Sequence, residues 1–340
     1  MFGLGWLRAL TDARGLLEHA HHGVPRLGEG YTTDDNARAL LYLSLLPEGA
    51  RDEGLVRTYL AFLLHMQKED GRFRNGLTLD GRFEDEGEAE DPTGRAVLAL
   101  AAAQRLPPPY AGPAREALLR ALPALEGFTS LRGRAYALLG LLALPKEPFL
   151  EAAEALGEGL LRAFREAEPA WPYPGPLTYA NHRPVEALYA YGLAFRRQEA
   201  VALARRALAF LKEHYFTPGE EGLFFDPVGN RFMARGRDKP LFDQQPIEAK
   251  CALLAHLRFG ERVLAEVAFL WFHGRNRLRA PRVDAFGPMD GLTPHGPNQN
   301  RGAEALLAYL LAWQALVQGV FPQVDEGVAL GRVFALGGRP

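Results

Sequence analysis

The chain has 340 residues, 48% of them hydrophobic and 24% charged, a composition that excludes disordered and fibrous classes of protein. Its 39 basic and 41 acidic side chains give a formal net charge of -2, which leaves no positive surplus for binding nucleic acid. Cys251 is the single cysteine, no leader pattern opens the chain, and no apolar run reaches the roughly 20 residues of a membrane span. We therefore expect a cytoplasmic protein without nucleic-acid or membrane partners. Few lysines and isoleucines occur, a bias that predicts a GC-rich genome and a thermophilic host.

Leu- and Ala-rich stretches with apolar residues at i, i+3, i+4 and i+7 recur along the chain, which predicts an all-α protein. Two kinds of helix alternate. Amphipathic helices with a charged face are predicted near 4–20, 52–67, 114–126, 148–166, 198–214 and 260–273. The other kind is apolar almost all round and begins with a polar cluster; the six clusters start at Thr33, Asp91, Thr129, Asn181, Asp243 and Asn298.

Helices that are apolar on all sides must be enclosed by other elements. Six helical pairs achieve this by closing into an inner and an outer ring, and we therefore predict an (α/α)6 toroid, with an open superhelix of hairpins as the alternative. No linker divides the chain, so one domain is expected over 1–340, with 321–340 as a C-terminal tail.

In a toroid the inner helices run parallel, so the polar clusters meet at one face, where helix dipoles favour negative charge. Taken singly, each polar residue of these clusters has a simpler explanation, because helix starts favour side chains that cap the free backbone N–H groups. Pro92, Pro184 and Pro246 suit the first helical position, and Glu186 and Glu248 suit the N3 position. Each of these two glutamates is therefore a candidate for capping and for catalysis alike.

Capping does not explain the arginines that follow inside the first turns, Arg38, Arg95 and Arg134. A cation near a helix N-terminus opposes the dipole, so these residues predict anionic partners in a shared polar network. Aromatic side chains stand beside polar ones in the connecting loops, which suits the C–H faces of sugar rings. Trp171, Tyr173 and Tyr179 are the aromatic residues that we expect in a cleft.

Five ordered strings carry a resemblance: GYTTDDNARAL (30–40), EDPTGRAVLAL (90–100), LTYANHRPVEAL (177–188), FDQQPIEA (242–249) and NQNRGAEALLAYL (298–310). They resemble a bacterial and archaeal group of six-hairpin glycosidase-like domains, which stand alone or beside glycosyltransferases. The resemblance implies the (α/α)6 fold, a carbohydrate-active enzyme, and a glycosyltransferase as a potential partner. Two departures from the group are Gly175, where an acidic residue often occurs, and Ala305, where a serine often occurs. If the absent acid is catalytic in relatives, this chain has altered activity or none.

The favoured reaction is hydrolysis of an oligosaccharide by carboxylate acid/base catalysis, and the resemblance implies inversion. The catalytic candidates are Asp35, Glu90 and Asp243. Asp34 shares its cluster with Asp35, and Glu90 is free for catalysis if Asp91 caps its helix. The candidates for binding substrate are Asp34, Asn36, Arg38, Asp91, Arg95, Trp171, Tyr173, Tyr179, His182, Arg183, Glu186, Gln244, Gln245, Glu248, Asn300, Arg301 and Glu304.

Other functions fit the same pattern. A sugar epimerase or isomerase would use a histidine, His182 or His295. A glycoside phosphorylase, a non-catalytic carbohydrate-binding partner of a glycosyltransferase and a helical scaffold are further alternatives. His19, His21 and His22 crowd together, but no acidic ligand spacing supports a metal site, so no metal and no cofactor are expected.

Overall fold

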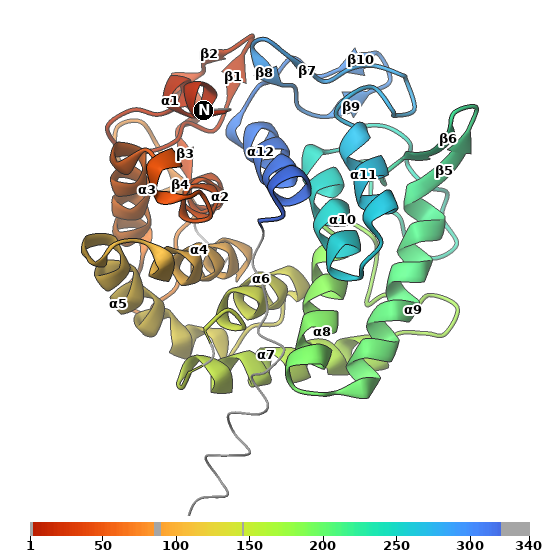
Figure 1. Cartoon of the computed structure of the whole chain (residues 1–340), viewed down its shortest axis with the longest axis horizontal. Helices are drawn as coiled ribbons and strands as arrows, with labels where there is room; N and C mark the ends of the chain where they lie inside the picture. The colour runs from red at the N-terminus through yellow and green to blue at the C-terminus, as the bar shows by residue number, and fades with distance from the viewer. Residues whose placement is uncertain (1–2, 85–89, 145, 321–340) are drawn as a thin grey trace, which may run out of the picture.

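The computed structural model describes residues 3–84, 90–144 and 146–320. The predicted tail over 321–340 lies outside these residues. Twelve α-helices occur in the described part, and six alternate ones form an inner ring (Figure 1). The inner helices are α2 (Thr33–Ser44), α4 (Glu90–Ala102), α6 (Leu131–Leu141), α8 (His182–Ala194), α10 (Pro246–Arg258) and α12 (Ala303–Gln318).

The remaining helices form the outer ring in Figure 1. They are α1 (Leu4–Leu10), α3 (Glu53–Met66), α5 (Pro108–Leu125), α7 (Phe149–Arg165), α9 (Gln198–Tyr215) and α11 (Arg262–Leu270). Each inner helix packs against the next, and α12 packs against α2, so the inner ring is closed. The prediction of an (α/α)6 toroid is therefore confirmed, and the open superhelix is excluded.

The inner helices can be enclosed by other elements because nearly all their side chains are apolar or, where polar, paired with other groups of the protein. In α4 every residue from Pro92 to Ala102 is buried, and in α10 every residue from Pro246 to His256. Outer helices bury one face alone: α7 buries residues at a helical spacing, including Leu156, Leu160 and Phe164, and turns charged residues to solvent. The two patterns in the sequence thus correspond to the two rings.

Local signals set the helix starts. Thr32, Asp52 and Ser130 are N-caps whose side-chain oxygens accept hydrogen bonds from backbone N–H groups of the first turns of α2, α3 and α6. The expected helix over 4–20 is wrong beyond Leu10. There the Asp12 carboxylate accepts hydrogen bonds from the backbone N–H groups of Arg14 and Gly15, which favours a turn over a continued helix.

Short strand pairs and 3-10 turns occupy the loops. The antiparallel pairs are β1 (Ala20–His21) with β2 (Val24–Pro25), β3 (Tyr31–Thr32) with β4 (Gly76–Leu77), β5 (Phe216–Gly219) with β6 (Gly222–Phe225), β7 (Val283–Asp284) with β8 (Gly287–Pro288), and β9 (Leu292–Thr293) with β10 (Gly296–Pro297). The 3-10 turns span Leu27–Glu29, Glu48–Ala50 and Ala103–Arg105. The β3–β4 pair lies directly before the N-terminus of α2 and so holds that end in place.

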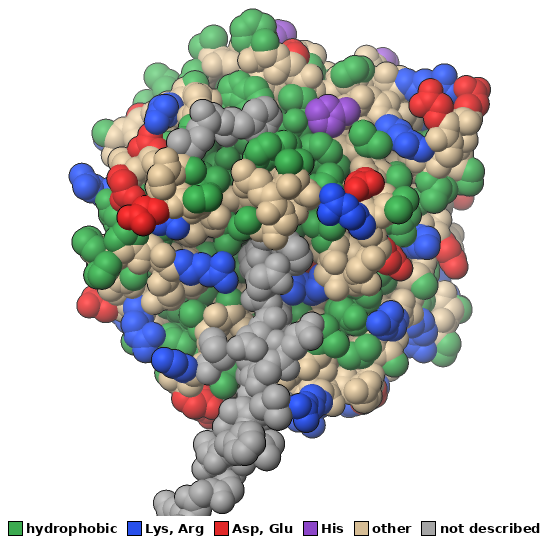
Figure 2. Space-filling model, viewed as in Figure 1, with side chains coloured by type: hydrophobic (Ala, Val, Ile, Leu, Met, Phe, Trp, Pro, Cys, Tyr) green, Lys and Arg blue, Asp and Glu red, His purple; other side chains and the backbone are tan. Residues whose placement is uncertain are grey.

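On the face shown in Figure 2, acidic and basic residues of the described chain are interspersed, with no extended basic patch. No helix of the described residues has the length and apolar character needed to cross a bilayer.

Candidate active site

A polar cavity of about 230 Å³ opens beside the N-terminal ends of α2 and α12. Loop residues before α2, before α10 and before α12 complete its wall. Five carboxylates line it: Glu18, Asp34, Asp35, Asp290 and Glu304. Two larger hollows lie at outer helices: about 370 Å³ between α5 and α7, and about 540 Å³ beside the β5–β6 hairpin. The 230 Å³ cavity is therefore the one at which acidic residues of the sequence motifs gather.

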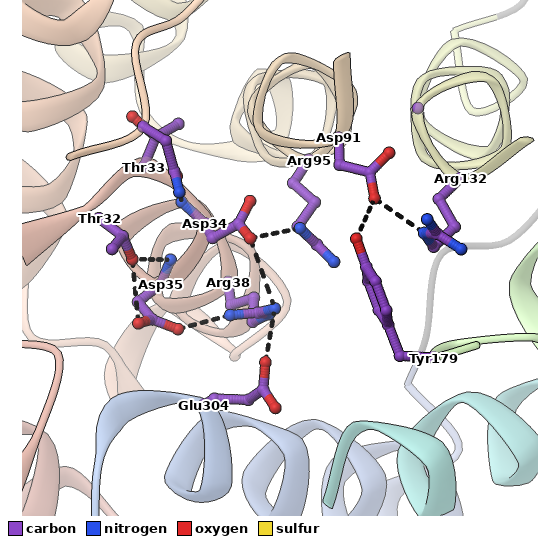
Figure 3. Close-up of polar contacts among 12 residues, drawn as sticks. Thr32, Thr33, Asp34, Asp35, Arg38, Asp91, Arg95, Arg132, Tyr179 and Glu304 are labelled. Atoms are coloured by element: carbon purple, nitrogen blue, oxygen red, sulfur yellow. Dashed lines mark hydrogen bonds and ion pairs between the residues drawn. The ribbon is translucent and has the colours of Figure 1, made fainter. Parts of the chain in front are cut away.

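Arg38 is the cation at the centre of these acids (Figure 3). Its guanidinium donates to Asp35 Oδ1 at 2.5 Å and to Glu304 Oε2 at 3.1 Å, and it lies 3.9 Å from Asp34 Oδ2. The Arg38 side chain is 6% exposed, so the contacts are made with little competition from water. The arginine that opposes the α2 dipole thus has the anionic partners that the sequence predicts.

Asp34 extends this network to the next inner helix. Its Oδ2 accepts a hydrogen bond from Arg95 of α4, while its backbone N–H donates to Asn75 Oδ1 at 3.3 Å. Asp34 Oδ1 is buried and has no hydrogen-bond partner. A buried carboxylate oxygen without a donor costs free energy, while the Asp34 side chain as a whole is 22% exposed and lines the cavity.

Asp35 is more fully engaged within the protein than Asp34. Its Oδ2 accepts from Thr32 Oγ1 at 3.0 Å, and its Oδ1 accepts from Arg38. Burial raises the pKa of Asp35, with Glu304 and Asp34 adding to the rise and Arg38 opposing it. Since both oxygens have protein donors, Asp35 is better placed to hold Arg38 than to contact a substrate.

Glu18 lines the cavity and did not stand out in the sequence. Burial, followed by the charges of Asp35, Glu29, Asp34 and Glu304, raises its pKa to about 7. Its Oε1 lies 3.5 Å from His19 Nε2. A carboxyl group that keeps its proton near neutrality can act as a general acid.

Asp290 is the second acid that sequence reasoning missed. Its Oδ2 accepts from Asn300 Nδ2 at 3.0 Å, and Asn300 Nδ2 also lies 2.9 Å from His19 Nδ1. Burial raises the pKa of Asp290, and the charge of Glu304 adds to the rise. Glu18 and Asp290 lie in loops outside the repeated helix starts, so no periodic signal marks them; the Asp290-Gly291 pair indicates merely a turn.

A second polar group lies next to Arg95 in Figure 3. Asp91 accepts from Tyr179 OH at 2.8 Å, from Arg132 Nε at 2.9 Å and from Ser130 Oγ at 2.6 Å. Although burial opposes it, the cations Arg95 and Arg132 and the Ser130 hydrogen bond lower the pKa of Asp91. The group joins α4, α6 and the loop before α8, and its donors and acceptors largely satisfy one another.

Glu90 and Asp243, two catalytic candidates, do not line the cavity. Glu90 Oε2 accepts from the backbone N–H groups of Thr129 at 2.8 Å and Ser130 at 2.5 Å, which places its charge at the N-terminus of α6. Asp243 is exposed and has a positive φ of 59°. The structure therefore gives Glu90 a capping role and Asp243 no site partner.

Other candidates are held in contacts within the fold. Asn36 exchanges hydrogen bonds with the backbone of Leu16. Gln244 donates to Asp226 Oδ1 at 2.8 Å and accepts from Trp271 Nε1 at 3.0 Å, whereas its neighbour Gln245 lines the cavity. Arg301 forms a two-pronged contact with Asp284 at 2.7 Å and thereby anchors the β7–β8 pair.

The start of α8 is also buried. Arg183 pairs with Glu186, which accepts a second hydrogen bond from Arg258 Nε at 3.0 Å. His182 is fully buried and neither ring nitrogen has a hydrogen-bond partner; burial and the nearby His256 hold its pKa well below its usual range. A histidine enclosed in this way does not reach the cavity, so a proton-transfer role for His182 finds no support in the geometry.

Glu248 is buried at the start of α10. Its Oε1 accepts from the backbone N–H of Ala180, its Oε2 has no partner, and burial raises its pKa to about 8.

Two of the three aromatic candidates pack against outer helices: Trp171 lies 4.8 Å from the Phe210 ring of α9, and Tyr173 lies 5.7 Å from the Phe164 ring of α7. Of the predicted site residues, those at the cavity are Asp34, Asp35, Arg38, Gln245, Asn300 and Glu304.

No group of three or more His, Cys, Asp or Glu side chains in the described segments is arranged to hold a metal ion. Four of the five carboxylates of the cavity contact Arg38 or Asn300 instead, as Figure 3 shows for Asp35 and Glu304 with Arg38.

No family model and no curated protein matches the chain in sequence. Solved structures match its fold. A D-mannose isomerase has a TM-score of 0.71 at 9% identity, covering 94% of this chain and 96% of that one. A cellobiose 2-epimerase from Bacillus thermoamylovorans has a TM-score of 0.68 at 9% identity, covering 91% and 95%. A GH76 α-mannanase from Bacteroides thetaiotaomicron has a TM-score of 0.60 at 10% identity, covering 98% and 95%. The chain therefore has the six-hairpin glycosidase-like fold, which hosts more than one reaction.

Proposed function

We propose that this chain is a carbohydrate-active enzyme that hydrolyses a glycosidic bond at the cavity between α2 and α12. The observation that carries the proposal is a carboxyl group with a raised pKa, Glu18, in the same cavity as carboxylates that are ion-paired with Arg38. Burial and neighbouring charges raise the pKa of Glu18 to about 7, while Glu304 is held 3.1 Å from the Arg38 guanidinium. Glycoside hydrolysis needs one carboxyl group that donates a proton and another that accepts one.

In this assignment Glu18 donates its proton to the leaving glycosidic oxygen. Glu304, whose side chain is 36% exposed, accepts a proton from the attacking water, and Asp34, which lines the cavity, binds a sugar hydroxyl. Asp35 holds Arg38 in place. This differs from the expectation from sequence, because Glu90 and Asp243 have other surroundings and Glu18 takes the role of acid.

The cavity also limits the substrate. Its volume of about 230 Å³ is below the roughly 300–1,000 Å³ of most ligand pockets. We propose that it takes one terminal sugar ring, with inversion at the anomeric carbon as the expected stereochemical course. The amide group of Gln245 on the wall supplies a further donor and acceptor for hydroxyl groups.

Epimerisation or isomerisation is the second candidate, because His19 lies on the cavity wall next to Glu18 and structural neighbours include epimerases. A screen of gluco- and manno-configured oligosaccharides in D2O distinguishes the reactions. Hydrolysis releases a new reducing end without deuterium in the sugar carbon skeleton, whereas epimerisation by proton transfer exchanges deuterium at the carbon beside the carbonyl group.

The inactive variant is informative in the same screen. Glu18→Gln should strongly reduce sugar release and keep ligand-dependent thermal stabilisation. Binding without turnover in the unaltered protein would instead indicate a carbohydrate-binding module, the form expected of a non-catalytic partner of a glycosyltransferase. Sugar release that survives in both Glu18→Gln and Glu304→Gln would refute the assignment.

A further inference from the structure

A further cavity, smaller than the three described above, lies on the axis of the inner ring. Its volume is about 10 Å³, close to that of one water-sized sphere. Each of the six inner helices contributes to its wall, and the contributing residues include Arg38, Arg95, Tyr136, Arg183, Lys250 and Leu311. The cavity is therefore a feature of ring closure and not of one loop.

Four cations surround this cavity, and three of them have carboxylate partners. Arg38 pairs with Asp35 and Glu304, and Arg95 pairs with Asp34. Arg183 pairs with Glu186, which Arg258 also contacts. Lys250 is 2% exposed, and no hydrogen bond or ion pair joins it to another of the described residues.

The cations Arg38, Arg95, Arg183, Arg258 and Lys250 therefore carry one positive charge more than their four acidic partners, Asp34, Asp35, Glu186 and Glu304. An uncompensated charge in a protein interior is unfavourable unless it is paired or loses its proton. Without a counterion, the pKa of Lys250 is lowered to about 7. Burial is the largest cause, the three nearby arginines add to the lowering, and Cys251 opposes it.

Unused hydrogen-bond donors gather at the same place. The Nε atoms of Arg38, Arg95 and Arg183 are buried and have no acceptor, and neither does the hydroxyl group of Tyr136. The Arg95 and Arg183 guanidinium carbons lie 4.6 Å and 5.6 Å from the centre of the Tyr136 ring, so these groups cluster about one residue. Buried donors are normally paired, so the cluster indicates a missing acceptor.

We propose that the axial cavity binds one small monovalent anion, with chloride as the occupant, between Lys250 and the unpartnered donors of the ring arginines and Tyr136. One negative charge balances the excess positive charge, and a spherical acceptor suits donors that belong to several different helices. The space is small, so a single spherical ion suits it better than a larger phosphate or carboxylate ligand. Arg38 and Arg95 also hold Asp34, Asp35 and Glu304, so the ion supports the wall of the candidate active site from below.

The test compares salts on the full chain. The midpoint temperature of unfolding is measured at pH 7 in sodium chloride, sodium methanesulfonate and sodium phosphate of equal ionic strength. Chloride should raise the midpoint in a saturable way and the other two anions should not, since a ligand of the folded state stabilises it by mass action. Crystals grown in sodium bromide should show one anomalous peak on the ring axis within reach of Lys250.

Lys250→Met should remove the chloride-dependent rise in midpoint, whereas the matched control Lys212→Met, at an exposed position of α9, should retain it. If Lys250→Met does not fold, the bromide experiment on the unaltered protein decides. Equal midpoints in chloride and methanesulfonate, a cavity that holds water alone in bromide crystals, or stabilisation by phosphate in place of chloride would each overturn the proposal. A bromide peak in the crystal without any effect of chloride on the unfolding midpoint in solution would mark an adventitious ion only, and would also overturn the proposal.

Discussion

Arg38 of α2 donates a hydrogen bond to Glu304 of α12 at 3.1 Å, although 266 positions separate the two residues in the sequence. This contact joins the first and the last inner helix at the wall of the polar cavity. It shows why ring closure and the site depend on each other: the carboxylates of the first and last motifs share one guanidinium only because the ring closes.

Replacement of Arg38 by methionine should destabilise the fold strongly. Asp35 is buried and would lose the partner that lies 2.5 Å away, and a buried charge without its partner costs about 3–5 kcal/mol. We expect this loss in the free energy of unfolding measured with guanidinium chloride. Arg165→Met is the control, because the Arg165–Glu199 pair is half exposed and should contribute little to stability. Equal effects of the two substitutions would contradict the buried network.

Glu18→Gln should reduce activity while leaving the fold intact. If Glu18 is the general acid, kcat should fall by about 10²–10⁴-fold on a substrate with a poor leaving group. The control Glu48→Gln, at an exposed turn far from the cavity wall, should keep full activity. A fall in kcat for both variants would point to a non-specific effect of lost negative charge.

The pH profile of the unaltered enzyme should also report Glu18. The acid must carry its proton to donate it, so activity should be lost as pH rises through about 7, the pKa of this group. The loss should follow a single ionisation in kcat/KM. If activity stays constant between pH 6 and 8, Glu18 does not donate the proton.

Glu90 should affect stability and not chemistry. Its carboxylate accepts backbone N–H groups at the start of α6, so Glu90→Ala removes a helix cap and should cost about 0.5–2 kcal/mol. Asp243→Asn should change the free energy of unfolding by less than about 0.5 kcal/mol, because the residue is exposed. Both variants should retain kcat when assayed below their unfolding temperatures. A loss of kcat in one of these two variants would make the replaced residue a catalytic candidate again.

The sequence was sufficient to predict the helices and their two roles because each inner helix carries local signals. Caps such as Thr32 and Ser130 start helices, and enclosure follows from apolar residues on all sides. Which acid of a cluster faces the cavity is a different question. Asp34 and Asp35 are neighbours, yet Asp34 reaches Arg95 and Asp35 reaches Thr32, because successive helical residues point about 100° apart.

The remaining errors have the same kind of cause. Glu18 and Asp290 lie in loops, where tertiary contacts and not a repeating pattern decide direction. Glu90 appeared free because Asp91 was expected to cap its own helix; in the structure Asp91 contacts Tyr179 and Arg132, and Glu90 contacts the next inner helix. Partners across the ring cannot be read from spacing along the chain.

Glu248 provides a test of the buried acids by pH. Its pKa rises from 4.5 to about 8 in the folded protein because of burial, so the folded state holds a proton that the unfolded state releases between these values. Its contribution to stability is therefore full below about pH 4.5 and is lost as pH rises through about 8. Within this window the free energy of unfolding should fall by about 1.4 kcal/mol per pH unit from this group alone.

Glu248→Gln removes the ionisation and keeps an oxygen that can accept the N–H of Ala180. The variant should consequently gain stability relative to the unaltered protein between pH 5.5 and 8, as measured by urea unfolding. Glu266→Gln, at a half-exposed position of α11, should show no such trend. A difference between Glu248→Gln and the unaltered protein that is constant over this range would mean that Glu248 is ionised throughout, with a donor that reaches Oε2 in solution.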